Sequence, residues 1–204
     1  MPVPAWFEDL LEQELRPCLR LSGDQIAQLY THYELLERWN EKISLTSVEP
    51  GPEMVIRHYC ESLFLAAHLP EGALTIADLG SGAGFPGVPV AVTKPGSRVS
   101  LIESVHRKAV FLREATRHLT NIDIIAKRAE AVTARFDWVI SRAVHSKDVL
   151  SNVPRLASQL GLLVGESGLQ ELKGSPAIAW SEPIRLPWGD RKFLVMGSVS
   201  RGTS

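Results

Sequence analysis

Residues 75–87 read TIADLGSGAGFPG, and they carry the strongest indication of the fold in this sequence. An apolar run typical of a buried strand leads into four glycines within residues 80–87, and Pro86 lies where a following helix would begin. Glycines in such a turn allow a ligand to approach the backbone closely. Open α/β sheets bind ligands at the carboxyl ends of their strands. The stretch therefore predicts a small-molecule site at the edge of a parallel sheet.

Two cofactor classes fit these glycines, and a tight turn without a ligand is the third interpretation. The GxGxxG pattern at 82–87 matches the dinucleotide fingerprint, with Glu103 placed where an acid would bind the ribose. The overlapping DxGxGxG pattern at 78–84 resembles motif I of S-adenosylmethionine-dependent methyltransferases. The register favours the methyl donor, because Gly82 comes three residues after Leu79 whereas a dinucleotide fingerprint starts as its strand ends. The carboxylate of Asp78 also suits a cationic cofactor.

The chain on either side alternates short apolar runs with amphipathic segments, which predicts a parallel sheet with helices on both faces. Strands are expected at 74–79, 98–102, 122–126, 138–141 and 161–165, with helices at 86–93, 107–118, 129–133 and 147–160. The tail predicts a hairpin of 183–186 and 192–199 around a turn at 187–190. Helices are expected before the sheet at 6–15, from Ser22 or Asp24 to Trp39, and at 53–69.

These elements predict an α/β fold of the class I methyltransferase type. It has a Rossmann-like, mostly parallel sheet, a terminal antiparallel hairpin and an N-terminal helical extension. We expect the extension over residues 1–70 and the methyltransferase domain over 71–204, packed as one unit. A chain of 204 residues buries roughly 70% of its unfolded surface, so it needs no disulfide or metal to fold.

Composition and charge exclude several classes. No apolar run approaches the ~20 residues of a membrane span, and Met1–Leu10 carries two acids and no basic region, so we expect a cytoplasmic protein. Cys18 and Cys60 form no CxxC motif, so neither a disulfide framework nor a metal site is expected. The net charge is −1, yet residues 106–142 hold eight Lys/Arg against four Asp/Glu. This basic sector either binds phosphates or is a solvated helix face.

Polar residues follow three further expected strands. Glu103 ends the second strand and can accept hydrogen bonds from both hydroxyls of a ribose, or it is a solvated acid. Arg128-Ala129-Glu130 follows the third strand, where an adenine amine could be recognised. Arg142 ends the fourth strand, where it contacts cofactor or substrate phosphate or forms an ion pair.

Five motifs in order resemble the RsmG (GidB) family of bacterial 16S ribosomal RNA guanine-N7 methyltransferases. They are LERWNEKISLTS (36–47), IRHYCESL (56–63), GSGAGFPG (80–87), RAE (128–130) and SRA (141–143), and the resemblance covers residues 25–145. It implies a class I methyltransferase fold, S-adenosylmethionine as cofactor and 16S rRNA of the small ribosomal subunit as substrate. We expect a monomer without a metal.

The resemblance also implies a set of site residues. The family's cofactor contacts fall on Gly80, Phe85, Glu103, Ser104, Val105, Ala129, Glu130 and Arg142, to which the glycine motif adds Asp78, Gly82 and Gly84. Arg128 matches an arginine near the family's active site, so Arg128 and Arg142 are expected to position the reactants. Arg57 and His58 match a motif beside the cleft, and with Arg107 and Lys108 they form the expected substrate-binding set. His58 could equally be a structural hydrogen-bonding residue.

The chain departs from the family pattern in two places. Glu103 stands where the family commonly has Asp, and this keeps the acceptor oxygens on a longer side chain. Residues 160–168 read LGLLVGESG where a Pro-Gly-Gly turn and a strand ending in Lys-Gly are expected, Lys173-Gly174 is displaced, and the last strand lacks a basic end. Substrate binding is therefore less well specified than cofactor binding.

The expected chemistry needs no general base. Methyl transfer from a sulfonium is an in-line displacement helped by positioning, and guanine N7 carries a lone pair and no proton. The chain has neither the Asn/Asp-Pro-Pro-Tyr/Phe motif of amine methyltransferases nor a cysteine after the fourth strand. The alternatives are a methyltransferase for a non-RNA substrate, a ribosome-associated RNA-binding module without turnover and, more distantly, a dinucleotide oxidoreductase.

Overall fold

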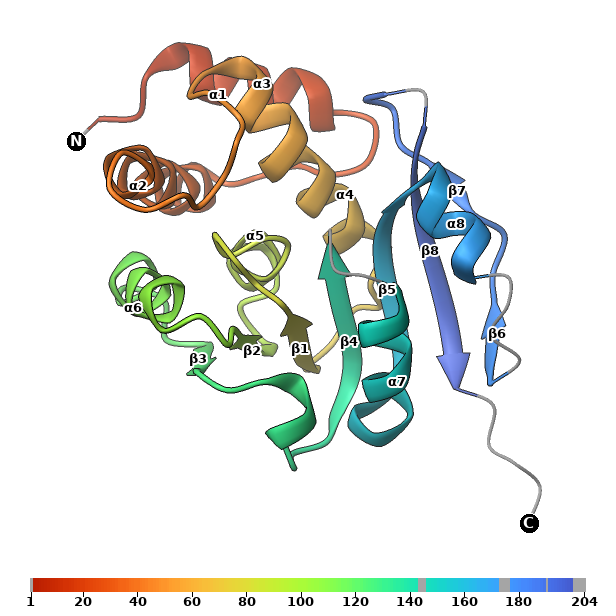
Figure 1. Cartoon of the computed structure of the whole chain (residues 1–204). Coiled ribbons are helices and arrows are strands. Elements are labelled where there is room, and N and C mark those ends of the chain that lie inside the picture. Colours follow the sequence, from red (N-terminus) through yellow and green to blue (C-terminus); the bar gives the residue numbers. More distant parts are fainter. Residues whose placement is uncertain (1, 143–145, 173–176, 190, 200–204) are drawn as a thin grey trace.

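The computed structural model describes residues 2–142, 146–172, 177–189 and 191–199, which form an eight-stranded sheet between two layers of helices (Figure 1). The strands are β1 (Thr75–Leu79), β2 (Arg98–Ile102), β3 (Ile122–Ile125), β4 (Phe136–Arg142), β5 (Ala157–Gly165), β6 (Ile178–Trp180), β7 (Ile184–Arg185) and β8 (Lys192–Val199). The helices are α1 (Ala5–Leu15), α2 (Gly23–Asn40), α3 (Pro52–Met54), α4 (Glu61–His68), α5 (Gly87–Thr93), α6 (His106–Ala115), α7 (Ser146–Leu156) and α8 (Glu166–Leu172).

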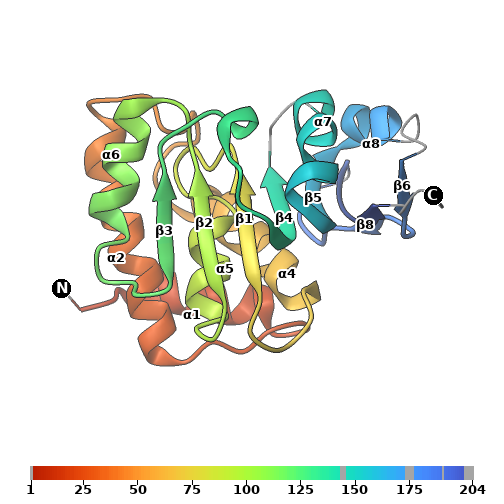
Figure 2. The ribbon, with the colours of Figure 1, turned by 90° about the horizontal axis from the view of Figure 1, so that it is seen from below.

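The sheet order is β3-β2-β1-β4-β5-β8-β6, and β7 pairs with β8 beside this path. Strands β1 to β5 are parallel to one another, whereas β8 runs antiparallel to both β5 and β6 (Figure 2). The expected α/β fold with a mostly parallel sheet is therefore confirmed. The terminal hairpin is also present, since β7 and β8 pair antiparallel.

Both faces of the sheet are apolar because its strands lie between helices. Ala77 and Leu79 face the core formed with α7 and α8, whereas Ile76, the residue before Ala77, faces the core formed with α4, α5 and α6. Val139 and Ile140 of β4 divide between the two cores in the same way. Side chains alternate along a strand, so a strand that is buried on both sides reads as a continuous apolar run.

The N-terminal helices share the second of these cores. A capping box starts α2, in which Ser22 Oγ accepts from Gln25 N at 3.3 Å and Gln25 Oε1 accepts from Ser22 N at 2.9 Å, so Ser22 and not Asp24 caps the helix. The apolar face of α2, which runs from Ile26 to Leu36, is buried in the same cluster as Phe7 and Val88. Helices α1 and α2 therefore share one core with α5, and the division into an extension and a domain stays a prediction.

Five segments differ from the sequence-based expectation. The helix expected over 147–160 ends at Leu156, and β5 begins at the next residue. The apolar positions Val149, Val153, Leu156 and Leu160 keep helical spacing, but Leu160 reaches the same core from a strand. The helix expected at 129–133 is one 3-10 turn, the helix expected at 53–69 contains a π-helical turn (Val55–Cys60), and β6 and α8 were not expected.

Other expectations concern residues at the margins of these elements. The helix after the glycines starts at Gly87, and Pro86 precedes it after a cis peptide bond. Ala143, Lys173, Gly174 and Asp190 lie outside the described residues. Over the described ranges, no helix is long and apolar enough to cross a membrane.

Replacing Phe7 by Ala tests the shared core. Phe7 is 0% exposed, and the centroid of its ring lies 5.1–5.9 Å from the ring centroids of Tyr30, Tyr33 and Tyr59. We therefore expect the free energy of unfolding to fall by about 3–5 kcal/mol. The matched control is Trp6→Ala, because Trp6 is 41% exposed and should lose much less. Urea unfolding of both variants measures the difference. Equal losses would contradict a single core that includes α1.

Candidate cofactor and substrate site

The glycine loop leaves β1 in a backbone conformation that side chains disfavour. Gly80, Gly82 and Gly84 have φ of 71°, 56° and 94°, in the left-handed region that glycine adopts most easily. A Cβ on Gly84 would lie 2.7 Å from Val88 Cγ2, and one on Gly87 would lie 2.2 Å from Leu101 Cδ2. The glycines at 84 and 87 therefore serve packing under the loop, while those at 80 and 82 shape its outer surface.

Two carboxylates hold the loop through its backbone. Asp78 Oδ2 accepts from Gly87 N at 3.0 Å, and Glu103 Oε2 accepts from Gly82 N at 2.9 Å. The other oxygen of Glu103 accepts from Val105 N at 2.7 Å, and each oxygen keeps further acceptor capacity for a ligand hydroxyl. Asp78 is fully buried, so the structure gives it a positioning role behind the loop, and its direct contact with a cofactor stays a prediction.

A buried histidine supports the loop from the helical side, and the sequence analysis missed it. His32 Nε2–H donates to Ala83 O at 3.0 Å, because a carbonyl can only accept, and His32 Nδ1 then accepts from the hydroxyl of Tyr59 at 2.7 Å. Burial lowers the pKa of His32 to about 4, so the ring is neutral. A polar residue on the apolar face of α2 was the available signal.

The first cleft, which we term the Glu130 cleft, opens beside Gly80 at the carboxyl ends of β1, β2 and β3. Its volume is about 190 Å³, and its lining is Leu79, Gly80, Ile102, Ser104, Lys127, Arg128, Ala129, Glu130, Asp148, Val149 and Asn152. Five residues expected from the sequence meet here: Gly80, Ser104, Arg128, Ala129 and Glu130. The cleft combines apolar walls with acceptor side chains, as a purine nucleoside requires.

The second cleft, the Phe85 cleft, lies on the other side of Gly80. It is lined by Leu45, Thr46, His58, Gly80, Ser81, Gly82, Ala83, Phe85, Lys108 and Arg142. Gly82, Phe85, His58, Lys108 and Arg142 were all expected here, whereas Leu45 and Thr46 were not. Because the two clefts share Gly80, a ligand in the first can extend across the glycine backbone into the second.

A buried network fixes Arg142 at the border of the Phe85 cleft. Its Nη1 donates to His58 Nδ1 at 2.7 Å, and its Nε lies 3.4 Å from Glu61 Oε2. His58 Nε2–H consequently donates to Thr46 Oγ1 at 2.7 Å. Burial, and next the charge of Arg142, lower the pKa of His58 to about 3. His58 lines the cleft and makes structural hydrogen bonds, and its contact with a substrate stays a prediction.

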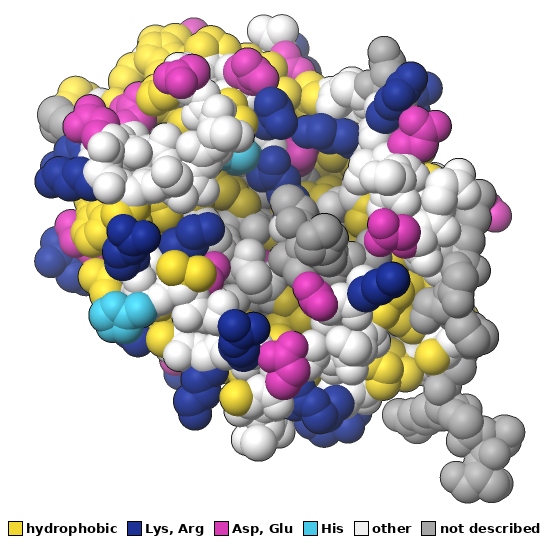
Figure 3. Space-filling view, in the orientation of Figure 1, with side chains coloured by type: hydrophobic (Ala, Val, Ile, Leu, Met, Phe, Trp, Pro, Cys, Tyr) yellow, Lys and Arg dark blue, Asp and Glu magenta, His cyan; other side chains and the backbone are white. Residues whose placement is uncertain are grey.

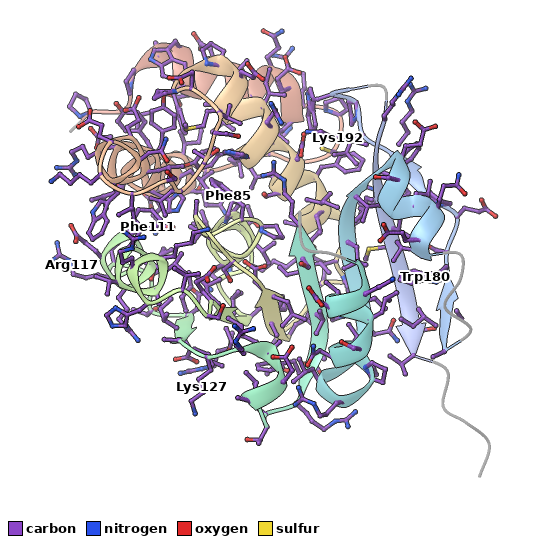
Figure 4. The ribbon with its side chains drawn as sticks, in the orientation of Figure 1. Phe85, Phe111, Arg117, Lys127, Trp180 and Lys192 are labelled. Atoms are coloured by element: carbon purple, nitrogen blue, oxygen red, sulfur yellow. The ribbon has the colours of Figure 1, made fainter. Side chains whose placement is uncertain are left out.

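Several expected residues lie outside these two clefts. Arg107 is exposed on α6 beyond the lining, so its contact with a substrate stays a prediction. Gly84 packs inward against Val88 and His32, and Val105 reaches the site through its N–H to Glu103. Arg57 lines a neighbouring pocket with Glu61 and Lys192, neither of which was expected. Figure 3 shows Lys and Arg side chains around the hollowed middle of this face, and Figure 4 places Phe85 beside α5.

The lining fits S-adenosylmethionine. Gly80, which lines both clefts, has no side chain, and Glu103 lies outside both linings but accepts from the N–H of the nearby Gly82. Leu79, Ile102 and Val149 give the Glu130 cleft apolar walls for an adenine ring. Among the described residues, no group of three or more His, Cys, Asp or Glu side chains could hold a metal ion.

The sheet order, the glycine loop and the paired clefts define a class I S-adenosylmethionine-dependent methyltransferase. A SAM-dependent methyltransferase of Aquifex aeolicus superposes with a TM-score of 0.61 at 13% identity, over 72% of this chain and 93% of that one. Magnesium protoporphyrin IX methyltransferase of Synechocystis, solved with bound SAM, superposes with a TM-score of 0.59 at 14% identity, over 89% and 99%. At these identities the likeness concerns the fold.

Sequence relatives identify the family. Residues 25–177 match the family described as GidB, rRNA small subunit methyltransferase G. The ribosomal RNA small subunit methyltransferase G of Stenotrophomonas maltophilia is 36% identical over 212 residues, covering 96% of this chain and 97% of that protein. Its counterpart in Xanthomonas campestris is 36% identical over 192 residues, covering 86% and 88%. The chain belongs to this family, and the resemblance drawn from its motifs is confirmed.

Replacing Asp78 by Asn tests the buried acid through pH. Burial is the main cause that raises the pKa of Asp78 to about 7, although the Gly87 N–H opposes it. The folded state therefore binds a proton that the unfolded state releases above pH 4, so the wild type loses stability as pH rises towards 7. Over this range the free energy of unfolding of the wild type should fall by an amount on the order of 3 kcal/mol. Asp78→Asn resembles the neutral acid, so we expect this fall to be absent in the variant. Denaturant unfolding at pH 4.5 and pH 7.5 measures it, and an equal pH dependence in both proteins would contradict it.

Two variants of Glu103 test its role at the loop. Gln offers one acceptor oxygen for two backbone N–H groups, so Glu103→Gln must release Gly82 or Val105. Losing a hydrogen bond to a charged group costs about 1.5–3 kcal/mol, so affinity for S-adenosylmethionine should fall on the order of 10- to 100-fold. Glu103→Asp keeps both acceptors and should lose less. Calorimetry measures both, and a tight-binding Gln variant would contradict the assignment.

Proposed function

We propose that this protein transfers a methyl group from S-adenosylmethionine to N7 of a guanine in 16S rRNA of the small ribosomal subunit. The observation that carries the proposal is that the two clefts adjoin at Gly80, which lines both. The Glu130 cleft suits the nucleoside of the cofactor, and the Phe85 cleft, which begins at Gly80, is bordered by Lys108 and Arg142. A base that enters the Phe85 cleft therefore approaches the cofactor, while Lys108 and Arg142 at the border can bind the phosphates of the RNA.

The Phe85 cleft lacks a free base, which supports N7 as the acceptor. His58 has its Nδ1 occupied by Arg142 and its Nε2–H by Thr46, and its low pKa keeps the ring neutral. Lys108 and Arg142 supply the remaining ionisable groups among the described residues of the lining, and both are cations. Guanine N7 has no proton to remove, so positioning is what this site has to provide. Bound S-adenosylmethionine supplies the electrophilic methyl group.

The two arginines expected at the active site take different places. Arg128 lines the Glu130 cleft and is exposed, so we assign it to the cofactor side. Arg142 borders the Phe85 cleft and is held by His58 and Glu61, so we assign it to positioning the substrate backbone. A cation directly at the base would oppose the positive charge that develops on the purine. We also propose that the protein acts in the cytoplasm as a monomer.

The test uses labelled S-adenosylmethionine and small subunits from cells that lack their own copy of the enzyme. We expect label in 16S rRNA as 7-methylguanine, with turnover by Arg142→Ala reduced on the order of 10-fold or more because a cation held by charged hydrogen bonds is lost. The matched control is Arg98→Ala, since Arg98 pairs with Asp123 at the opposite ends of the strands.

Each outcome of this assay separates the alternatives. Label in another rRNA base would keep the enzyme class and overturn N7 as the acceptor. Cofactor binding without label in any RNA would overturn the substrate and favour a protein or small-molecule acceptor. RNA binding without cofactor binding would indicate a binding module that has lost turnover.

A further inference from the structure

We infer that a third pocket, which borders the Phe85 cleft, binds a backbone phosphate of the substrate RNA, with Lys192 as a binding residue. This inference rests on the proposed function and extends it to Lys192, which neither the family motifs nor the sequence analysis indicated as a site residue. The Lys192 pocket has a volume of about 210 Å³ and is lined by Arg57, Glu61, Arg142, Leu163, Val164, Gly165, Leu186, Lys192 and Phe193. It shares Arg142 with the Phe85 cleft.

The sheet topology brings Lys192 to this edge. Lys192 is the first residue of β8 and pairs with Gly165, the last residue of β5. Because β8 is antiparallel to β5, its beginning lies at the carboxyl ends of the parallel strands, where the clefts are (Figure 4). A lysine at the other end of β8 would lie at the opposite edge.

The charges of the pocket leave an excess of cations. Glu61 is the one carboxylate in its described lining, and its side chain is 2% exposed. It pairs with both Arg142 and Lys192, so a single negative charge is shared between two positive ones. Arg57 adds a third cation and pairs with Glu53, which lies outside the lining. The lining therefore carries a net positive charge.

The cations also keep donors for an anion. Lys192 has three N–H donors and gives one to Glu61, and its side chain is 32% exposed. Arg142 has five N–H donors and uses its Nε towards Glu61 and one N–H of Nη1 towards His58. Glu61 thus orients the two cations and leaves part of each free to bind a phosphate oxygen.

The lowered pKa of His58, which lines the neighbouring Phe85 cleft, agrees with this arrangement of cations. After burial, the charges of Arg142, Arg57 and Lys192 all lower the pKa of His58. Three cations of this pocket therefore raise the potential where the clefts meet. A nucleotide whose base enters the Phe85 cleft carries its phosphate at the rim, and this potential favours the phosphate there.

The experiment compares Lys192→Gln, Lys192→Arg and Lys94→Gln with the wild type. Lys94 is the matched control because it also pairs with a glutamate, Glu71, but at the amino ends of the strands. Binding of purified 16S rRNA is measured by filter retention at four salt concentrations, KM for small subunits by methylation, and cofactor affinity by calorimetry. The salt slope is the steepness with which the logarithm of the binding constant falls with the logarithm of the salt concentration, and loss of one phosphate contact lowers it by about one.

We expect Lys192→Gln to weaken RNA binding about 5- to 30-fold, lower the salt slope by about one and raise KM, with cofactor affinity unchanged. Lys192→Arg should restore binding, and Lys94→Gln should leave it intact. An unchanged slope and KM in an active Lys192→Gln enzyme would overturn the inference alone. A parallel loss of cofactor affinity without rescue by Arg would also overturn it, since it would assign Lys192 a structural role. Weaker binding to subunits but not to purified RNA would indicate a ribosomal protein as the partner. A wild type that neither binds nor methylates 16S rRNA would overturn the proposed function itself.

Discussion

The glycine loop after β1 is held in one conformation from three sides, and the site depends on this constraint. Asp78 binds the loop at Gly87, Glu103 binds it at Gly82, and His32 binds it at Ala83. Each contact reaches a backbone group, so the loop keeps its shape while Gly80 and Gly82 stay in the lining of the Phe85 cleft. Both clefts meet at this surface, and a shift of the loop would change them together.

Holding polar groups at this site costs stability. Asp78 is buried with a raised pKa, and His32 and His58 are kept neutral by burial. A buried acid destabilises the folded state at neutral pH, and neutral histidines destabilise it when pH falls below about 6.5. The two effects have opposite signs and act over the same pH range, from about 4 to 6.5, so each partly cancels the other there. Buried ionisable groups with shifted pKa values at the carboxyl ends of the strands are typical of functional sites.

Sequence reasoning succeeded where the signal was local. The strand-loop-helix of residues 75–93 followed from apolar residues and glycines, and the residues after β2, β3 and β4 followed from the parallel sheet. It predicted a strand at 161–165 but placed the start of β5 too late, because Leu160 continues the helical spacing of Val149 and Val153 across the end of α7. Pairing with β4 and β8 makes this segment a strand, and no local pattern reports such pairing.

The sequence was enough to predict the class of protein, the cofactor loop and half of the residues that line the two clefts. Only the tertiary structure decided how those residues act: Asp78 lies behind the loop, Arg142 binds His58 and Glu61, and Lys192 joins the site from the last strand. The difference lies in how far apart in the sequence the interacting residues are. Backbone turns and strand ends depend on neighbouring residues, whereas ion pairs such as Lys192–Glu61 join residues far apart in the chain and arise only when the sheet has formed.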